Sequence, residues 1–277
     1  MTFVRSIYKK AYYHSLNLLL IRKEVRLPSP YRSKRNVFLY FDYEREFSGY
    51  DTNIGDGEIR EILRMLNERK IVTTWFTVGK LLIKYPDSIA DILSYGHEIG
   101  SHTYAHIPPF YTANKILERD FEMFHKASST ITTIKGFHSP TGKWSLKQLK
   151  YLNTYNYAYD IISCSKRRDC KPHYVITGPG SKNLRMYTCG DDWPLFKRKG
   201  KAGETLNYYS ELIDNLEPGV VGGIGFHPWV LFSNKNLLKG FNDLLDYLKN
   251  QDDVVLNTAQ FYADLLRTKD NHHGESP

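Results

Sequence analysis

The strongest constraint on the fold is a repeated alternation of short apolar runs with amphipathic segments. Residues 37–41 form a compact apolar run that predicts a buried strand. Residues 56–70 follow with apolar side chains at helical spacing, acidic residues early and basic residues late, as a helix dipole prefers. The pattern predicts further strands at 71–79, 98–102, 134–140, 157–162, 220–228 and 254–258, and further helices at 86–95, 112–127, 145–154, 203–216, 235–249 and 258–267.

Strand–helix alternation of this kind indicates a parallel α/β sheet, either closed as a barrel or open and doubly wound. In both architectures, functional groups gather beyond the C-terminal ends of the strands. The basic, cysteine-containing stretch from about 163 to 200 is less regular and interrupts the pattern. The residues that follow each predicted strand are therefore the first place to search for a site.

Four predicted strand ends carry chemically active side chains. The first provides Asp42 and Glu44, and "EIGSH" leads into His102 and His106. Two later ends provide one histidine each, at positions 138 and 227. Because parallel strands end at one edge, we expect these groups to meet at one mouth.

The residue types at these ends suit a metal-assisted hydrolysis. Two histidines four residues apart on a helical turn, His102 and His106, lie on one face and can bind the same ion, with a carboxylate as third ligand. The ion lowers the pKa of bound water and polarises a carbonyl group. A second carboxylate then serves as base and a separate histidine as acid. Asp42, Glu44 and His227 are the candidates for these roles.

The chain of 277 residues predicts one catalytic domain over residues 36–268, between a basic segment at 1–35 and a disordered tail at 269–277. Residues 6–26 predict a basic amphipathic helix. Two interpretations stay open, since this helix can lie on a membrane surface as a peripheral contact or pack against the domain. The apolar run 16–21 is too short to span a bilayer.

Charge and cysteine content bear on partners and location. The formal charge is +8, concentrated near the front and in residues 166–171 and 197–201. A basic surface attracts phosphates or anionic headgroups. Nucleic acid is not expected, because no RNA-binding, helix-turn-helix or zinc-finger pattern occurs. Cys164, Cys170 and Cys189 are an odd number without a CxxC pair, which favours reduced thiols and a cytoplasmic location, including the inner face of the membrane. One bridge with a third thiol is the alternative.

The motifs resemble the NodB-type polysaccharide deacetylases of carbohydrate esterase family 4, over residues 36–268. "YFDYE" is similar to the first family motif and "HTYAH" to the second, which makes Asp42 the base and His102 and His106 metal ligands. "IGFHPW" resembles the fifth motif and makes His227 the general acid. The resemblance implies a distorted (β/α)7 barrel of parallel strands and one divalent ion, with zinc favoured. It also assigns His97 a structural role and Gly100 a close packing position.

Two positions depart from the family pattern. Tyr43 stands where the family has its aspartate ligand, so the D-x-E form of the first motif makes Glu44 the carboxylate ligand. "FHSPTG" has His138 where the third motif has an arginine that pairs with the catalytic aspartate. A permanently charged group is thereby replaced by one that titrates near neutrality. His138 is either a working catalytic replacement or a packing residue.

The resemblance also suggests residues that contact the substrate. Pro140 and Thr141 follow the third motif, and the backbone N–H at Thr141 corresponds to one that helps hold the oxyanion. "YAYD" resembles the weaker fourth motif, so Asp160 is expected to orient a catalytic histidine. "DDWPLF" lies where such enzymes place an aromatic cleft wall, and indicates Asp192 and Trp193.

The function expected from these residues is metal-dependent removal of an N-acetyl or other acyl group from an amino sugar. The basic front favours a glycan or a lipid- or nucleotide-linked sugar that bears phosphate. One alternative is hydrolysis of another amide, such as a formamide or a cyclic amide, in the same barrel. The other is a non-catalytic descendant that binds a glycan or a protein, which the altered first and third motifs favour.

Overall fold

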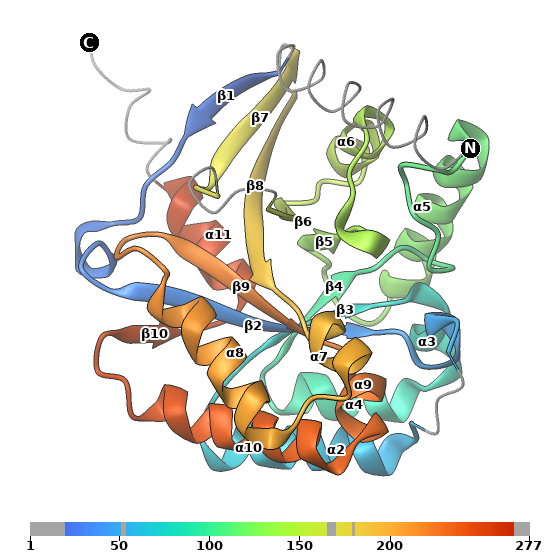
Figure 1. Ribbon diagram of the computed structural model, residues 1–277. Helices are drawn as coiled ribbons and strands as arrows, with labels where there is room; N and C mark the ends of the chain where they lie inside the picture. Colours follow the sequence, from blue (N-terminus) through green and yellow to red (C-terminus); the bar gives the residue numbers. More distant parts are fainter. Residues whose placement is uncertain (1–19, 51–53, 165–169, 179–180, 269–277) are drawn as a thin grey trace, which may run out of the picture.

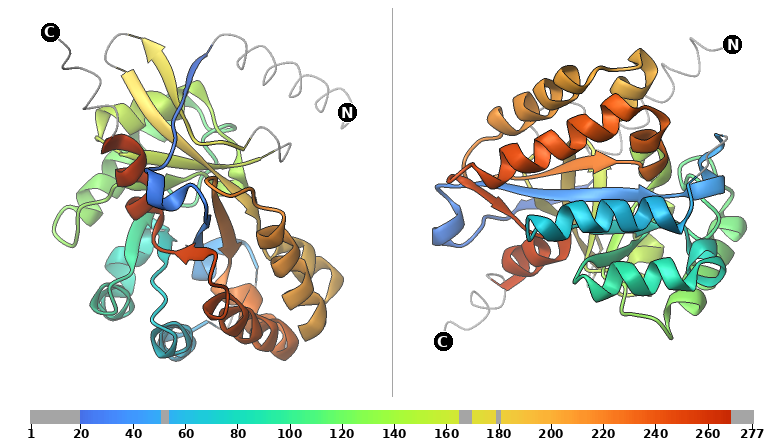
Figure 2. Two further views of the ribbon diagram at one scale, coloured as in Figure 1. Left: turned by 90° about the vertical axis from the view of Figure 1, so that its left-hand side faces the viewer. Right: turned by 90° about the horizontal axis from the view of Figure 1, so that it is seen from below.

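Seven parallel strands close into a barrel. The structure is a computed structural model that describes residues 20–50, 54–164, 170–178 and 181–268. Helices lie around the outside of the strands (Figures 1 and 2). The distorted (β/α)7 barrel is confirmed, and the open sheet is excluded because the last strand of the ring pairs with the first. The order around the ring is β2 (Arg35–Tyr43), β3 (Thr74–Thr77), β4 (Glu98–Ser101), β5 (Gly136–His138), β6 (Tyr159–Ser163), β8 (Ser181–Gly190) and β9 (Val221–Phe226).

Three further strands lie outside this ring, and the described helices connect and cover it. Most predicted elements occur at their predicted positions, with ends that differ by a few residues. The strands are β1 (Ile21–Glu24), β7 (His173–Gly178) and β10 (Val254–Leu256). The helices are η1 (Ser29–Tyr31), η2 (Arg45–Ser48), α2 (Asp56–Glu68), α3 (Gly79–Lys84), α4 (Pro86–Ser94), α5 (Asn114–Ser128), η3 (Pro140–Gly142), α6 (Leu146–Thr154), α7 (Trp193–Arg198), α8 (Ala202–Asp214), α9 (Pro228–Ser233), α10 (Lys235–Lys249) and α11 (Ala259–Thr268).

Large aromatic side chains fill the barrel interior, and each of four has a glycine as its partner on the neighbouring strand. Successive residues of a strand point to opposite faces, so alternate residues face inward. A Cβ built on any of the four glycines would overlap the partner's ring. The spacing of the strands therefore depends on these glycines. The register pairs are Phe38 with Gly223, Tyr40 with Gly225, Phe76 with Gly100, and Tyr159 with Gly136.

Helix α11 closes the N-terminal end of the barrel. Tyr262 and neighbouring apolar residues of α11 belong to the same buried cluster as the interior aromatic rings. The helix begins on polar groups from the strand starts, because the N–H of Ala259 donates to Oγ1 of Thr74 (2.8 Å) and the N–H of Gln260 to Glu98 (2.9 Å). Burial raises the pKa of Glu98. With this end closed, the C-terminal end is the open mouth.

The irregular stretch from 163 to 200 contains a barrel strand that the sequence pattern did not predict. β8 pairs in parallel with both β6 and β9. Leu184 and Met186 face the interior, and Arg185 between them faces outward, where an ion pair with Asp160 buries it. The predicted strand at 254–258 is present as β10 but lies outside the ring, paired with β2. The prediction of seven barrel strands is therefore correct in number, but β8 takes the place in the ring that was expected for residues 254–258.

The expectation of a helix over residues 6–26 is wrong for its described part. Residues 21–24 form β1, which pairs antiparallel with β7 and extends the sheet beside β8 at the top of Figure 1. Residues 6–19 and the tail 269–277 lie outside the described residues. In the described part of the chain, no helix is long and apolar enough to cross a membrane.

The basic residues before β2 lie at the far end of the barrel from the mouth. Arg35 begins β2 and forms ion pairs with Asp214 (2.5 Å) and Asp253 (2.8 Å). Lys34 donates to the carbonyl of Asp252. Asp42 is seven residues further along the same strand, about 23 Å away at the usual rise of a strand. These charges therefore lie far from any substrate held at the mouth.

The cysteines match the alternative interpretation, in which one disulfide bond leaves a third cysteine outside it. Cys164 and Cys170 form a disulfide bond, and Cys189 is outside it. The expectation of three reduced thiols is therefore wrong. Disulfides persist mainly in oxidising compartments, so this bond bears on the location of the protein.

His97 is a structural histidine, as the resemblance implies. Its side chain is buried, and Nδ1 accepts the backbone N–H of Thr73 (3.0 Å). Burial lowers its pKa to about 4. His173, at the start of β7, is also buried with its pKa lowered to about 4.

Replacing Gly100 by alanine tests the pairing of rings with glycines. The new Cβ would lie 2.5 Å from Cδ1 of Phe76 in a closed interior. We expect the free energy of unfolding to fall by about 1–3 kcal/mol, the usual cost of overpacking. Gly57→Ala in α2 is the matched control, because nothing lies within 4 Å of its added Cβ. Urea unfolding that shows equal effects for both variants would contradict the pairing.

His97 gives the stability of the protein a pH dependence of known sign. The folded chain binds the His97 proton with a pKa of about 4, against 6.5 for the ordinary side chain. Because the unfolded chain binds that proton more tightly, stability falls as the pH decreases from about 6.5 to 4, by about 3 kcal/mol. His97→Asn keeps an acceptor for Thr73 but cannot titrate. Urea unfolding between pH 7 and 4.5 should show a shallower slope for the variant, and an unchanged slope would contradict this account.

Candidate metal centre and its acid–base partners

The mouth of the barrel brings together the side chains predicted from the strand ends. Asp42 lies near the end of β2 and His138 ends β5. Nδ1 of His138 lies 2.8 Å from Oδ1 of Asp42, at hydrogen-bond distance. Both side chains are buried. His138 is therefore a hydrogen-bonding partner of Asp42, at the position where the motif that it resembles has an arginine.

Glu44 lies between the two histidines of "HTYAH". Its Oε1 is 2.9 Å from Nε2 of His106 and 3.5 Å from Nε2 of His102. Ligands that share one zinc ion at about 2.0–2.2 Å lie about 3–3.5 Å apart. The three side chains fit a His/His/carboxylate metal site. Strand alternation explains why Glu44 rather than Tyr43 takes this place, since Tyr43 is buried against Trp75 in the outer core.

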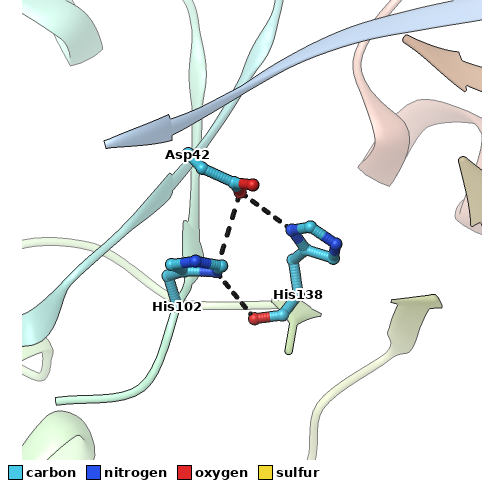
Figure 3. A group of neighbouring side chains, drawn as sticks. All are labelled: Asp42, His102 and His138. Atoms are coloured by element: carbon cyan, nitrogen blue, oxygen red, sulfur yellow. Dashed lines mark hydrogen bonds and ion pairs between the residues drawn. The ribbon is translucent and has the colours of Figure 1, made fainter. Parts of the chain in front are cut away.

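His102 can contribute to two groups of possible ligands, and its hydrogen bonds distinguish them. One group is Glu44, His102 and His106, and the other is Asp42, His102 and His138. In Figure 3, Nδ1 of His102 faces the carbonyl oxygen of His138, 2.9 Å away. A carbonyl only accepts, so Nδ1 carries the hydrogen and Nε2 keeps its lone pair. Because Nε2 faces Glu44, the geometry favours the first group.

The histidine pair is held by a bend rather than by the helical turn that the spacing suggests. Thr103 and His106 both have positive φ, at 63° and 57°. Asp120 of α5 stabilises this bend, since its carboxylate accepts the N–H groups of Tyr104 (2.8 Å) and Ala105 (2.9 Å). Non-glycine residues in this conformation are costly and gather at functional sites. Asp120 was not predicted, although an aspartate on the apolar face of a helix was a usable signal.

Trp229 positions the other oxygen of Glu44. Its Nε1–H donates to Oε2 over 3.0 Å, which leaves Oε1 for the histidines. Hydrogen bonds of this kind orient metal-binding carboxylates. Trp229 is also buried in the hydrophobic core, so it combines packing with this polar contact.

His227 faces the same space from β9 and is oriented by Asp192. Its Nε2 lies 3.7 Å from Asp42 and 3.9 Å from Glu44. Asp192 binds both its Nδ1 (2.6 Å) and its backbone N–H (2.7 Å). The orienting role expected of Asp160 therefore falls to Asp192. Asp160 instead binds Arg185 and Gln148 on the outer side of the barrel, so that expectation is wrong.

The remaining predicted residues lie around the mouth. Pro140 is buried, and Thr141 is exposed with φ at 69°. Trp193 begins α7 and packs edge-on against Tyr50 (5.5 Å between ring centroids). Tyr50 also stacks on Trp229 at 4.8 Å, and its side chain is 44% exposed. An aromatic wall at this side of the mouth therefore exists, with Tyr50 as an additional member.

Burial and charge together set the protonation of the site. Burial raises the pKa of Asp42, but the neighbouring histidines outweigh it and lower the pKa below its ordinary value. The same balance holds for Glu44, whose pKa is lowered further. Burial lowers the pKa of His227, but Asp192 and Glu44 raise it well above its ordinary value. Two buried carboxylates thus depend on positive partners, and a divalent cation satisfies the same requirement.

A parallel barrel whose mouth holds two carboxylates and four histidines defines the class of this protein, a (β/α)7 barrel with a candidate metal centre. A family model described as polysaccharide deacetylase matches residues 30–159. This match covers a little less than half of the chain, and it includes the first three of the motifs that resemble that family.

One curated protein is similar in sequence to part of this chain. The chain is 24% identical over 149 residues to the peptidoglycan deacetylase of Helicobacter pylori, which covers 52% of this chain and 50% of that protein. The chain thus spans about half the length of this curated relative.

Solved structures share the fold. A Mycobacterium smegmatis protein described as a candidate polysaccharide deacetylase has a TM-score of 0.74 and 15% identity, over 90% of this chain and 95% of that one. An allantoinase gives 0.67 and 17%, over 88% and 93%. A Bacillus anthracis protein of carbohydrate esterase family 4, described as a pseudoenzyme, gives 0.55 and 15%, over 84% and 67%. At these identities the likeness concerns the fold alone.

Metal content tests the ligand assignment. We expect the purified chain to bind about one zinc ion, and His102→Ala/His106→Ala to bind none, because two of its three ligands are removed. His125→Ala is the matched control, since His125 lies on α5 with its ring tilted against Tyr155 rather than among the proposed ligands. Elemental analysis after dialysis measures the metal. Equal zinc in the double variant would contradict the assignment.

Proposed function

We propose that this protein removes an acyl group from an N-acylated amino sugar of a glycan by metal-dependent hydrolysis. The observation that carries the proposal is the placement of Asp42 and His227 beside the Glu44–histidine group. Nε2 of His227 lies 3.7 Å from Oδ2 of Asp42 and 3.9 Å from Oε1 of Glu44. A base and an acid must both reach the scissile amide. The relationship to polysaccharide deacetylases supports a carbohydrate substrate.

Glu44, His102 and His106 would hold the metal. When bound, a divalent ion supplies Lewis-acid polarisation of the acyl carbonyl and of the attacking water. Trp229 and the carbonyl of His138 keep two of these ligands in the orientation that binding requires.

Asp42 and His227 would move the protons. Asp42, with its lowered pKa, is ionised near neutral pH and can accept a proton from the attacking water. His138 orients this carboxylate through its hydrogen bond. His227, with its raised pKa, is protonated and can donate to the departing amine. The backbone at Thr141, at the rim of the mouth, is the proposed contact for the oxyanion.

The aromatic wall is the proposed contact for the sugar ring. Trp193 and Tyr50 offer ring faces and edges beside the site, and Tyr50 is partly exposed. Arg35, which forms ion pairs, and Lys34, which donates to a backbone carbonyl, lie at the other end of the barrel. The proposal therefore does not require phosphate on the substrate. The disulfide favours an oxidising compartment over the cytoplasm. In such a compartment, polymeric glycans such as cell-wall polymers are accessible.

A substrate panel tests the proposed activity. Acetylated glucosamine oligomers, a formamide and a cyclic amide are incubated with the zinc-loaded protein, and released acid or ring-opened product is measured. We expect acetate from the oligomers, and a loss of at least about 100-fold with Asp42→Asn, which removes the base. Activity confined to the formamide or the cyclic amide would support the rival hydrolases. Binding of oligomers without turnover would support a non-catalytic protein.

Asp192→Asn tests the orientation of the proposed acid. The amide cannot stabilise a protonated His227, so we expect kcat to fall about 100-fold with little change in KM. Asp160→Asn is the matched control, because it leaves Arg185 buried without its carboxylate partner but does not touch the mouth. It should lower the free energy of unfolding by about 3–5 kcal/mol and leave kcat unchanged in the folded fraction. A loss of kcat in Asp160→Asn alone would reverse the assignment.

A further inference from the structure

Glu44 lies just beyond the end of the strand that carries it. β2 ends at Tyr43, whose register partner on β3 is Thr77. The carbonyl oxygen of Tyr43 accepts the N–H of Val78 (3.1 Å), and the described ladders of β2 do not continue past this residue. The sheet therefore holds the backbone of Asp42 but not that of Glu44. The direction of the Glu44 side chain depends on the residues that follow it.

Arg45 turns the chain sharply at this point. It begins η2, and its φ of 46° lies in the left-handed region that favours glycine. The carbonyl oxygen of Glu44 accepts the N–H of Phe47 (2.9 Å), which closes the turn. A non-glycine residue in this conformation is costly and persists only where the surrounding structure holds it there. The contacts of the Arg45 side chain supply that restraint.

The Arg45 side chain is buried and held by two helices. Its Nη2 donates to Oδ1 of Asp56 (2.5 Å) at the start of α2 and to Oγ of Ser88 (3.2 Å) in α4. The hydroxyl of Ser88 donates to the same oxygen of Asp56 (2.7 Å). The guanidinium carbon lies 3.7 Å from the centre of the Tyr85 ring, within stacking distance. Because only 4% of the Arg45 side chain is exposed, these contacts leave it little freedom.

We infer that Arg45 is a positioning residue for Glu44. Its contacts with α2 and α4 fix where the chain leaves β2, and this exit aims the Glu44 carboxylate into the mouth. Oε1 of that carboxylate then meets His106 (2.9 Å), and Oε2 accepts the Nε1–H of Trp229 (3.0 Å). The metal-binding role of Glu44 rests on the proposed function, whereas its placement by Arg45 can be measured without metal or activity.

Arg69 provides the matched control for the loss of an ion pair. Its Nε lies 2.7 Å from Oδ1 of Asp246, and only 11% of its side chain is exposed. Arg69 directly follows α2, whose 13 residues place it about 20 Å from Asp56. Arg69→Met therefore removes a comparable interaction away from the mouth, while Arg45→Met removes the one beside Glu44. If Arg45 served stability alone, the two variants would behave alike at the metal site.

The indole N–H of Trp229 reports the position of Glu44 in the metal-free protein. In NMR spectra of isotope-labelled chains, a hydrogen-bonded indole proton resonates downfield of a free one, and Glu44→Ala marks the unbonded position of the Trp229 signal. We expect Arg45→Met to shift this signal upfield toward that position, and Arg69→Met to leave it at the wild-type position. Asp56→Ala removes the partner of Arg45 at a side chain that is 42% exposed. It should give a smaller shift in the same direction, and it replaces Arg45→Met if that variant does not fold. A wild-type Trp229 signal in both Arg45→Met and Asp56→Ala would overturn the inference.

Zinc affinity, measured by competition with a coloured chelator, tests the consequence for the metal site. Mutation of residues that orient metal ligands weakens metal binding by about 10–100-fold. We expect a loss of this size in Arg45→Met and wild-type affinity in Arg69→Met, with circular dichroism confirming that both are folded. Equal losses in the two variants, or no loss in Arg45→Met, would contradict the positioning of Glu44. If the wild-type chain binds no zinc, the proposed function fails, and the Trp229 signal still decides whether Arg45 positions Glu44.

Discussion

The packing of each interior aromatic ring against a glycine on the next strand is the constraint on which the rest of the structure depends. A seven-stranded barrel is too narrow for large side chains on every inward position, so rings and glycines must alternate around it. Phe38, Tyr40 and Phe76 lie opposite glycines in this way. This pairing fixes which residue of each strand is the last one inside the barrel. It thereby decides that Asp42 and His138 meet at the mouth.

At the mouth, the arrangement of the side chains depends on electrostatic interactions more than on packing. Asp42 and Glu44 are both buried, and neither would stay ionised there without positive or hydrogen-bonding partners. The protein surrounds them with histidines, two of which are held by a further group. His102 is bonded to the carbonyl of His138, and His227 to Asp192. A histidine at position 138, where the motif that the sequence resembles has an arginine, is compatible with this arrangement, because its Nδ1 contacts Asp42.

Much of this could be read from the sequence, and the failures have physical reasons. The helix and strand periods located most elements, and strand-end residues such as Asp42 and His102 were found because parallel strands end together. β8 was missed because it lies in a basic, irregular stretch, and its pairing with β6 and β9 joins residues that are distant in sequence. The orienting role was assigned to Asp160 rather than to Asp192 because pairing between a carboxylate and a histidine that are distant in sequence depends on tertiary contacts. β1 was mistaken for a helix because its strand pairing with β7 is long-range.

The alternation of rings and glycines also has a consequence for how the chain reaches this fold. If two neighbouring strands paired one residue out of register, the rings of one would turn outward and the glycines of the other would face an empty interior. Such an intermediate gains few contacts, whereas the correct pairing gains a close fit at every step. Long-range parallel pairing is slow and open to error. The four glycine positions therefore favour the correct strand register during folding, and the same residues shape the mouth in the folded protein.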